Sequence, residues 1–345
     1  MIAAEMPIDE VPLATLVEAV RGVSGAHLWS PDSRPGVLLV DLDVDLGPES
    51  GTPASVPALH GGVGAVVVGV TATDPPEAHP AAAVCDVVLA TGDPALDAVV
   101  ATVESFPVAS CALAGLLRGV ERRSTDAGLT AESAVYSALQ AGPEFAAWRA
   151  ARPRRDRPPA GDPVVVERRG HTLHVTLDRP HVRNALDTAM RDQLVDALTL
   201  PAVDATITAV HLRGEGRDFC AGGDLDEFGT FPDPARAHLV RLQQSVGRAI
   251  DAVRDRVTVH LHGACIGSGI ELPAFAGRVI AAPSTTIALP EVSLGLVPGA
   301  GGTVSLPRRI GRHRTARLAL AGERVDAAVA LAWGLVDAVG PPADG

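Results

Sequence analysis

A pair of glycine-rich loops limits the possible folds of this chain more than any other feature. The loops occupy residues 218–228 and 262–272, and each follows an apolar run typical of a buried strand. Glycine lets a backbone approach a ligand closely, and the second loop leads into a predicted helix whose first N–H groups lack partners. Two such loops, brought together, can direct two N–H groups at one oxygen atom. Two tight turns that bind nothing are the alternative interpretation.

Strands and helices alternate around these loops. Alternating apolar residues at 171–177 predict a strand, and apolar runs at 207–212 and 257–261 predict two more. A helix is expected over residues 235–253. Another helix is predicted by four apolar residues that repeat every fourth position: Leu186, Met190, Leu194 and Leu198. This alternation predicts a layered α/β domain.

A segment rich in proline and arginine, at residues 151–162, separates this domain from the first part of the chain. Before it, valine-rich and leucine-rich runs at 37–42, 65–70 and 86–90 predict buried parallel strands, and the following residues predict helices. Breaks are expected at Phe106-Pro107, at residues 119–128 and at Gly142-Pro143. The expected division is a small α/β region (1–92), a helical segment (93–152), a linker (153–162) and a C-terminal domain (163–345).

Composition and charge exclude several classes of protein. With 47% hydrophobic and 20% charged residues, the chain can bury a sizeable core. A net charge of -12 argues against nonspecific binding to nucleic acid. The four cysteines show no metal-binding spacing. We found no secretory signal and no apolar run of roughly 20 residues, so we expect a cytoplasmic protein that does not span a membrane.

Four motifs follow one another in a distinctive order. They are Arg-Pro followed by Asn-Ala-Leu (179–186), Cys-Ala-Gly-Gly-Asp-Leu (220–225), Gly-Ser-Gly-Ile-Glu-Leu (267–272) and a segment from Pro-Glu to Pro-Gly-Ala-Gly-Gly-Thr (290–303). In this order they resemble the crotonase (enoyl-CoA hydratase/isomerase) superfamily over about half of the chain. The resemblance implies a crotonase-like spiral of ββα units in the C-terminal half. It also implies an acyl-CoA thioester substrate, no metal, no cofactor apart from the coenzyme A of the substrate, and a homo-oligomer, as a trimer or hexamer.

The resemblance also implies a role for individual residues. The N–H groups of Gly223 and Ser268 match the two donors of the family's oxyanion hole, and Glu271 and Glu291 match its two catalytic carboxylates. The positions that match substrate-binding residues of the family are Ala221, Asp224, Leu225, Gly299, Arg183 and Ala185.

Two glutamates favour hydration of an enoyl-CoA. Adding water across a conjugated thioester needs one group that activates water and another that delivers a proton to Cα. A carboxyl in a water-poor cleft, near a second carboxylate, has a raised pKa and can serve in either role. Isomerisation and hydrolysis of a thioester or C–C bond are the alternatives within the superfamily. A catalytically silent partner subunit is the alternative of another class.

Two residues depart from the usual family pattern, and a pair of histidines is a further candidate site. Ser268 stands where glycine or alanine is more usual, and Pro273 lies inside the predicted helix that carries Glu271, where it should kink or tighten the turn. His260 and His262 alternate on a strand and suggest a metal pair, but no third ligand follows. We therefore interpret both histidines as packed or surface residues.

The helical segment before the linker resembles the tail that family members usually carry after their last motif. In this chain the corresponding motif, Trp333 to Asp337, lies within about ten residues of the end. We therefore expect residues 93–152 to pack on the C-terminal half, with Tyr136, Phe145 and Trp148 as anchors. For residues 1–92, a degenerate crotonase-like half and an unrelated α/β domain remain open alternatives.

Overall fold

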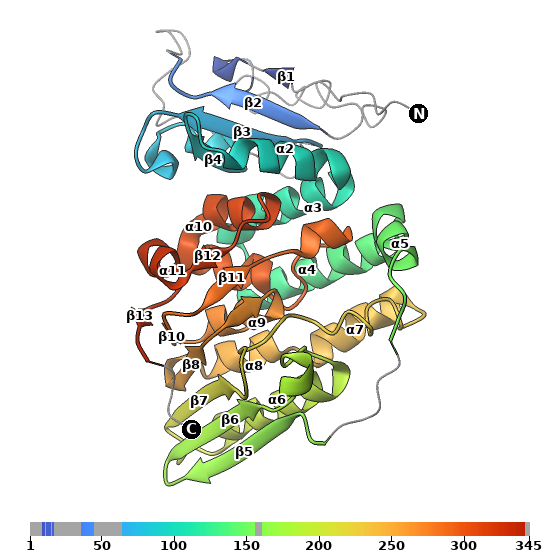
Figure 1. Cartoon of the computed structure of the whole chain (residues 1–345), viewed down its shortest axis with the longest axis vertical. Helices are drawn as coiled ribbons and strands as arrows, with labels where there is room; N and C mark the ends of the chain where they lie inside the picture. The colour runs from blue at the N-terminus through green and yellow to red at the C-terminus, as the bar shows by residue number, and fades with distance from the viewer. Residues whose placement is uncertain are drawn as a thin grey trace. The chain divides into compact units, whose positions relative to one another are not determined.

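The computed structural model describes residues 9–10, 12–14, 16, 36–44, 64–155 and 161–341. The chain divides into two compact units. The first contains Met1–Arg122 together with Gly311–Glu323, and the second contains Arg123–Ile310 together with Arg324–Gly345. Figure 1 shows the elements of both units. Of the expected linker, residues 156–160 lie outside the described part of the chain.

The first unit is built on a four-stranded sheet in the order β1-β2-β3-β4, with every neighbouring pair parallel. The prediction of buried parallel strands before the linker is therefore confirmed. Its elements are β1 (Asp9–Glu10), β2 (Val37–Asp41), β3 (Val66–Thr71), η3 (Pro76–Ala78), η4 (Ala82–Val84), β4 (Val87–Ala90), α2 (Ala95–Ser105), α3 (Pro107–Arg118) and η5 (Val120–Arg122). The expected break between α2 and α3 falls at Phe106 because Pro107 starts a new helix.

A buried ion pair holds this sheet to α3. The Arg118 guanidinium lies 2.6 Å from the Asp86 carboxylate, and both side chains are 1% exposed. Asp86 also accepts a hydrogen bond from Val67 N at 2.9 Å, and Arg118 donates to Ala65 O at 2.6 Å. The pair thus connects α3 with β3 and with the start of β4.

The second unit contains a six-stranded sheet and a three-stranded sheet, in the orders β13-β10-β8-β7-β6-β5 and β12-β11-β9. The larger sheet is parallel except for the antiparallel pair of β5 and β6. Its strands are β5 (Val164–Arg169), β6 (Thr172–Leu177), β7 (Ala209–Gly214), β8 (Val257–Leu261), β10 (Arg278–Ala281) and β13 (Ala338–Val339). The smaller sheet contains β9 (Ala264–Ile266), β11 (Thr286–Ala288) and β12 (Val325–Asp326).

Helices connect these strands, so the expected layered α/β domain is confirmed. Among the described residues, the helices that lie wholly in this unit and follow its strands are α6 (Thr188–Val203), α7 (Pro234–Gln243), α8 (Val246–Ala252), α9 (Ser268–Glu271) and α11 (Ala327–Trp333). Short 3-10 helices are η6 (Pro180–Val182), η7 (Arg254–Arg256), η8 (Pro273–Phe275) and η9 (Glu291–Leu294). The helix α10 (Gly302–Leu320) is kinked at Gly311, whose φ is +77°, and the residues from this kink onward group with the first unit.

Two sequence-based expectations need correction. The single helix predicted over residues 235–253 is two helices, α7 and α8. The Ser245 hydroxyl accepts a hydrogen bond from Arg248 N at 3.3 Å and so caps α8 as a new helix. The strand predicted at 207–212 begins two residues later, at Ala209. Pro273 acts as expected, because α9 ends after one turn and a 3-10 helix begins at this proline.

The helical segment before the linker is shared between the units. The helices α4 (Thr125–Gln140) and α5 (Pro143–Ala150) belong to the second unit, whereas α2 and α3 belong to the first. Figure 1 shows α4 beside α7, and Ser137 Oγ on α4 donates a 2.7 Å hydrogen bond to Pro234 O. The expected packing on the C-terminal half is thus confirmed for α4 and α5.

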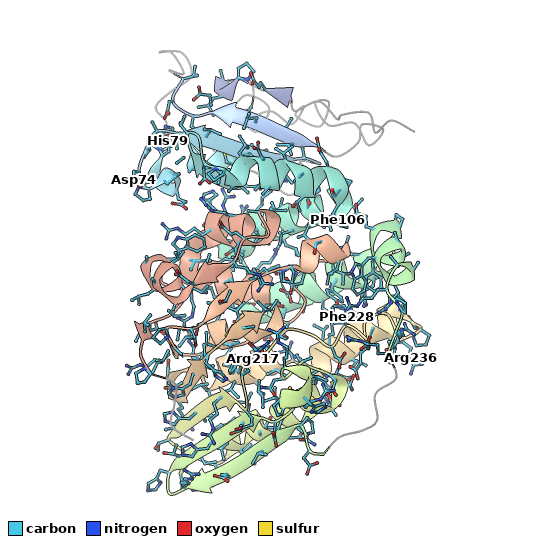
Figure 2. The ribbon with its side chains drawn as sticks, in the orientation of Figure 1. Asp74, His79, Phe106, Arg217, Phe228 and Arg236 are labelled. Carbon is cyan, nitrogen blue, oxygen red and sulfur yellow. The ribbon has the colours of Figure 1, made fainter. Side chains whose placement is uncertain are left out.

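Aromatic rings also attach α5 to this unit. The rings of Phe145 and Trp148 are stacked with their centroids 5.6 Å apart. The Trp148 ring lies 6.4 Å from that of Phe228, which is labelled in Figure 2. Phe145 and Trp148 therefore occupy the contact for which they were predicted.

No single helix among the described residues is long and apolar enough to cross a membrane. The pair α2 and α3 has the combined length and composition, with a bend of 114° between its two helices.

Candidate active site

The two glycine-rich loops lie side by side in the second unit. Cys220 N donates to Ala264 O at 3.2 Å, and Ile266 N donates to Cys220 O at 3.0 Å. The first loop thereby extends the edge of β9 and forms a parallel bridge between Cys220 and Cys265. The arrangement expected from the sequence, two loops facing one space, is present.

Each loop contains a backbone N–H group without a hydrogen-bond partner among the described residues. Gly222 has a φ of +100° and precedes Gly223, and Gly267 has a φ of +52° and precedes Ser268. Within the described ranges, no acceptor takes a hydrogen bond from the N–H of Gly223 or Ser268. Ser268 is buried and Gly223 is partly buried, and two unpaired N–H groups on neighbouring loops suggest a binding site for an oxygen atom.

Gly223 and Ser268 both line a cavity of about 270 Å³ in the second unit. Its walls come from α4, from the loop after Gly223, from α7 and α8, and from the turn before α10. The predicted site residues that line it are Gly223, Asp224, Ser268, Glu271, Glu291 and Gly299. Apolar lining from Leu129, Phe228 and Leu272 accompanies these polar groups.

Glu271 closes the short helix α9 and is buried. Its Oε2 accepts hydrogen bonds from Ala300 N at 2.8 Å and Gly302 N at 2.9 Å. Burial raises the pKa of Glu271 to about 7, although the two donated hydrogen bonds oppose this shift. A carboxyl of this kind exchanges protons near neutral pH.

Glu291 begins η9 and is also buried. Burial and, second, the charge of Glu271 raise the pKa of Glu291 well above its usual range. Its Oε2 has no hydrogen-bond partner within the described part of the chain. A Cβ atom placed on Gly267 would lie 2.2 Å from Glu291 Oε1 and 3.8 Å from Glu271 Oε1. The two carboxyls therefore flank the same glycine, beside the amide of Ser268.

A third buried carboxyl, which the sequence interpretation did not identify, comes from α4. Glu132 is 2% exposed, lines the cavity and accepts hydrogen bonds from Gly301 N and Thr303 N at 2.7 and 2.9 Å. Burial and, second, the charge of Glu271 raise the pKa of Glu132 to about 8, against the donated hydrogen bonds. The available signal was an acidic residue on the apolar face of a predicted helix, between Leu129 and Tyr136.

The remaining residues expected to bind substrate lie around the first loop, outside the cavity wall. Arg183 O accepts from Ala221 N at 2.9 Å, and Arg183 Nε lies 2.7 Å from Asp218 Oδ2. Leu225 O accepts from Arg149 Nη1 at 2.8 Å. Ala185 O likewise accepts a hydrogen bond from an arginine side chain. These four residues therefore lie around the first loop, held by hydrogen bonds of their backbone groups or, for Arg183, also of its side chain.

The histidines of the sheet are packed against one another. His211 Nδ1 lies 2.9 Å from His260 Nε2, and the two rings are stacked with centroids 5.2 Å apart. The ring of His174 stacks on the other side of His211 at 5.6 Å. His262 is separate, with its Nε2 3.0 Å from Gly216 O. No group of three or more possible metal ligands occurs in the residues that the structure describes.

Comparisons with known proteins identify the family of this chain. Residues 167–344 match the model of the family described as enoyl-CoA hydratase/isomerase. The 2,3-dehydroadipyl-CoA hydratase of Escherichia coli (strain K12) is 35% identical over 178 residues, which cover 52% of this chain and 69% of that protein. The enoyl-CoA hydratase of Thermoplasma volcanium GSS1 has a solved structure that is 35% identical, with a TM-score of 0.49, and the match covers 52% of this chain and 72% of that one. The chain therefore belongs to the enoyl-CoA hydratase/isomerase family, the crotonase superfamily.

Proposed function

We propose that this protein hydrates an α,β-unsaturated acyl-CoA thioester. The observation that carries the proposal is the pair of buried glutamates, Glu271 and Glu291, which flank Gly267 in one cavity. An isomerase can shift a double bond with one carboxyl. Adding water uses two groups, one that takes a proton from water and one that gives a proton to Cα. The E. coli relative is named a hydratase, which supports the same choice.

In the proposed mechanism, the N–H groups of Gly223 and Ser268 bind the thioester carbonyl oxygen. As water adds to Cβ, electron density moves through Cα to this oxygen and forms an enolate. The two amides stabilise the developing negative charge because they are already oriented and need no reorganisation. The enolate then takes a proton at Cα, which re-forms the carbonyl and completes the hydroxyacyl-CoA.

The two carboxyls divide the proton transfers according to their pKa values. Burial raises the pKa of Glu271 to about 7 and raises that of Glu291 well above its usual range. We therefore assign Glu271, the more readily ionised group, as the base that takes a proton from water. Glu291 is the acid that gives its proton to Cα. Groups whose pKa values are pushed apart commonly divide the acid and base roles in this way.

By family resemblance we assign the residues around the first loop to the coenzyme A portion of the substrate. They are Arg183, Ala185, Ala221 and Leu225, and Asp224 of the same region lines the cavity. Gly299 lies at the acyl end, where the ring of Tyr136 packs so closely that a Cβ on Gly299 would lie 2.5 Å from it. By family resemblance we also propose a homo-oligomer, as a trimer or hexamer, which analytical ultracentrifugation would test.

The test is turnover on a panel of enoyl-CoA esters, followed by loss of the absorbance of the conjugated thioester. Glu271→Gln and Glu291→Gln should each lower kcat by on the order of 10² or more. Glu167→Gln, an exposed carboxyl on β5, is the matched control and should retain the wild-type rate.

Two outcomes would overturn the proposal. Wild-type hydration by the Glu291 variant would indicate single-carboxylate chemistry, such as isomerisation. If the wild-type protein binds acyl-CoA, as shown by a raised melting temperature, but turns over none of the esters, a catalytically silent subunit is the better description.

A further inference from the structure

The turn that precedes α10 is held from two sides by carboxyl groups. We call residues 299–303 the glycine turn. Ala300 N and Gly302 N donate to Glu271 Oε2 at 2.8 and 2.9 Å. Gly301 N, between them, donates to Glu132 Oε1 at 2.7 Å. Successive amides of the turn thus alternate between the two glutamates.

Glu132 binds the end of the glycine turn more extensively than Glu271 binds its middle. Its Oε2 accepts two further hydrogen bonds, from Thr303 N at 2.9 Å and from Thr303 Oγ1 at 2.7 Å. Both oxygens of the Glu132 carboxyl are therefore occupied, and three donors fix its position. Three hydrogen bonds from two neighbouring residues hold this buried carboxyl in one orientation.

We propose that Glu132 is a positioning residue, which holds the glycine turn in the place from which its amides orient the Glu271 carboxyl. The proposal rests on the hydratase function proposed above. Glu132 lies on α4, in the segment before the linker and outside the residues that match the family model. A part of the chain that contains none of the recognised motifs thereby sets the geometry of the reaction.

Glu132 would influence Glu271 through the position of the glycine turn and through the hydrogen bonds that the turn donates. Glu271 depends on two amides of the glycine turn, so any shift of the turn moves the carboxyl or removes its hydrogen bonds. A misplacement of about 1 Å at a reacting group can lower a rate by on the order of 10². The titratable groups that face Glu132 are Glu271 from α9, Glu291 from η9, Tyr136 from α4 itself and Arg241 from α7.

Two substitutions separate the position of the group from its ability to ionise. Glu132→Asp keeps an ionisable carboxyl but withdraws it by about 1.5 Å, the length of one C–C bond. It cannot reach all three donors unless the glycine turn or α4 moves. Glu132→Gln keeps the length but replaces the carboxyl with a neutral amide, whose oxygen can still accept from Thr303 N and Thr303 Oγ1. Asp126→Asn, an exposed carboxyl on the same helix, is the matched control.

If Glu132 acts through position, the aspartate variant is the more damaged. We expect kcat to fall on the order of 10² in Glu132→Asp and on the order of 10-fold in Glu132→Gln, with little change in KM. Asp126→Asn should behave as wild type. An aspartate variant that is folded and keeps the wild-type kcat would overturn the proposal.

A second readout does not depend on turnover. Hydrogen bonds from the glycine turn favour the ionised form of Glu271, so losing them should raise its pKa above the wild-type value. Infrared titration of the buried carboxyl band that disappears in Glu271→Gln measures this pKa directly. We expect the titration to move to higher pH in Glu132→Asp and to stay in place in Asp126→Asn. An unchanged titration in a folded Glu132→Asp protein would refute the positioning role.

The two readouts also separate this proposal from the proposed function. If the wild-type protein hydrates no ester but the infrared titration moves as expected, the link between Glu132 and Glu271 stands and the hydratase assignment fails. If Glu132→Asp does not fold, Thr303→Val removes one of the three donors from the other side. Thr303→Val should lower kcat and move the Glu271 titration to higher pH, both by less than Glu132→Asp does. No change in either quantity would refute the proposal.

Discussion

As the pH rises, the Glu271→Gln variant should become more stable than the wild-type protein, because only the wild type loses stability. Glu271 Oε2 accepts both hydrogen bonds from the glycine turn, and Oε1 faces Gly267 and Glu291. The oxygen of a glutamine can occupy the first position and accept the same two bonds. Its NH2 group then faces Glu291 as a donor, where wild type brings two carboxyls together. The substitution thus preserves the packing and removes one ionisable group.

The size of the effect follows from the pKa of the carboxyl. Burial raises the pKa of Glu271 from 4.5 to about 7. When a group has a higher pKa in the folded state than in the unfolded state, its contribution to stability is complete at pH values below the unfolded-state pKa. This contribution is lost as the pH rises through the folded-state pKa. Between pH 4.5 and pH 7, wild type should lose about 3 kcal/mol that the glutamine variant does not lose.

Urea unfolding at several pH values between 5 and 8.5 measures this difference. The free energy of unfolding of Glu271→Gln, minus that of wild type, should increase by about 2.5 kcal/mol between pH 5 and pH 8.5 and level off above about pH 8. Glu167→Gln, exposed on β5, should show a difference that does not depend on pH. A flat difference for Glu271→Gln as well would refute the raised pKa and, with it, the proposed assignment of the base.

Three further predictions address other parts of the chain. Gly267→Ala should lower kcat by on the order of 10² or more, measured with enoyl-CoA esters, because the new Cβ would lie 2.2 Å from a site carboxyl oxygen. Arg118→Met should destabilise the first unit by about 3–5 kcal/mol in urea unfolding, because it leaves the Asp86 carboxylate buried without its charged partner. The isolated fragment 164–345 should be inactive because it lacks α4, and activity should return when residues 93–162 are added; full activity of the fragment alone would contradict this.

Local patterns in the sequence predict the elements of this fold well where one interaction dominates. The strand β8 coincides with the predicted run 257–261 because its apolar residues alternate without interruption. The helix predicted through 235–253 fails at Ser245, where a hydroxyl that caps a backbone N–H competes with the helical pattern around it. Such a cap depends on one side chain, which a count of apolar positions does not weigh.

The candidate site shows a different limit. The motifs pointed to Glu271 and Glu291 because each lies in a recognisable segment, and the structure brings both to one cavity. Glu132 lies 169 residues before Gly301, to which it is hydrogen-bonded. A contact over such a distance depends on how α4 packs, which the spacing of residues along α4 does not specify. The one local sign was an acidic side chain on an otherwise apolar helix face.

The glycines of the glycine turn are explained by the side chains that pack against it. A Cβ on Gly299 would lie 2.5 Å from the Tyr136 ring, one on Gly301 would lie 2.4 Å from the Phe275 ring, and one on Gly302 would lie 2.7 Å from Glu271 Cγ. Side chains approach the turn from several directions, so no side chain fits at these three glycines. The four successive amides from Ala300 to Thr303 are left open to carboxyls on both sides. A glycine run that resembles a flexible loop in sequence is therefore closely packed, which is why small displacements there should affect the reaction.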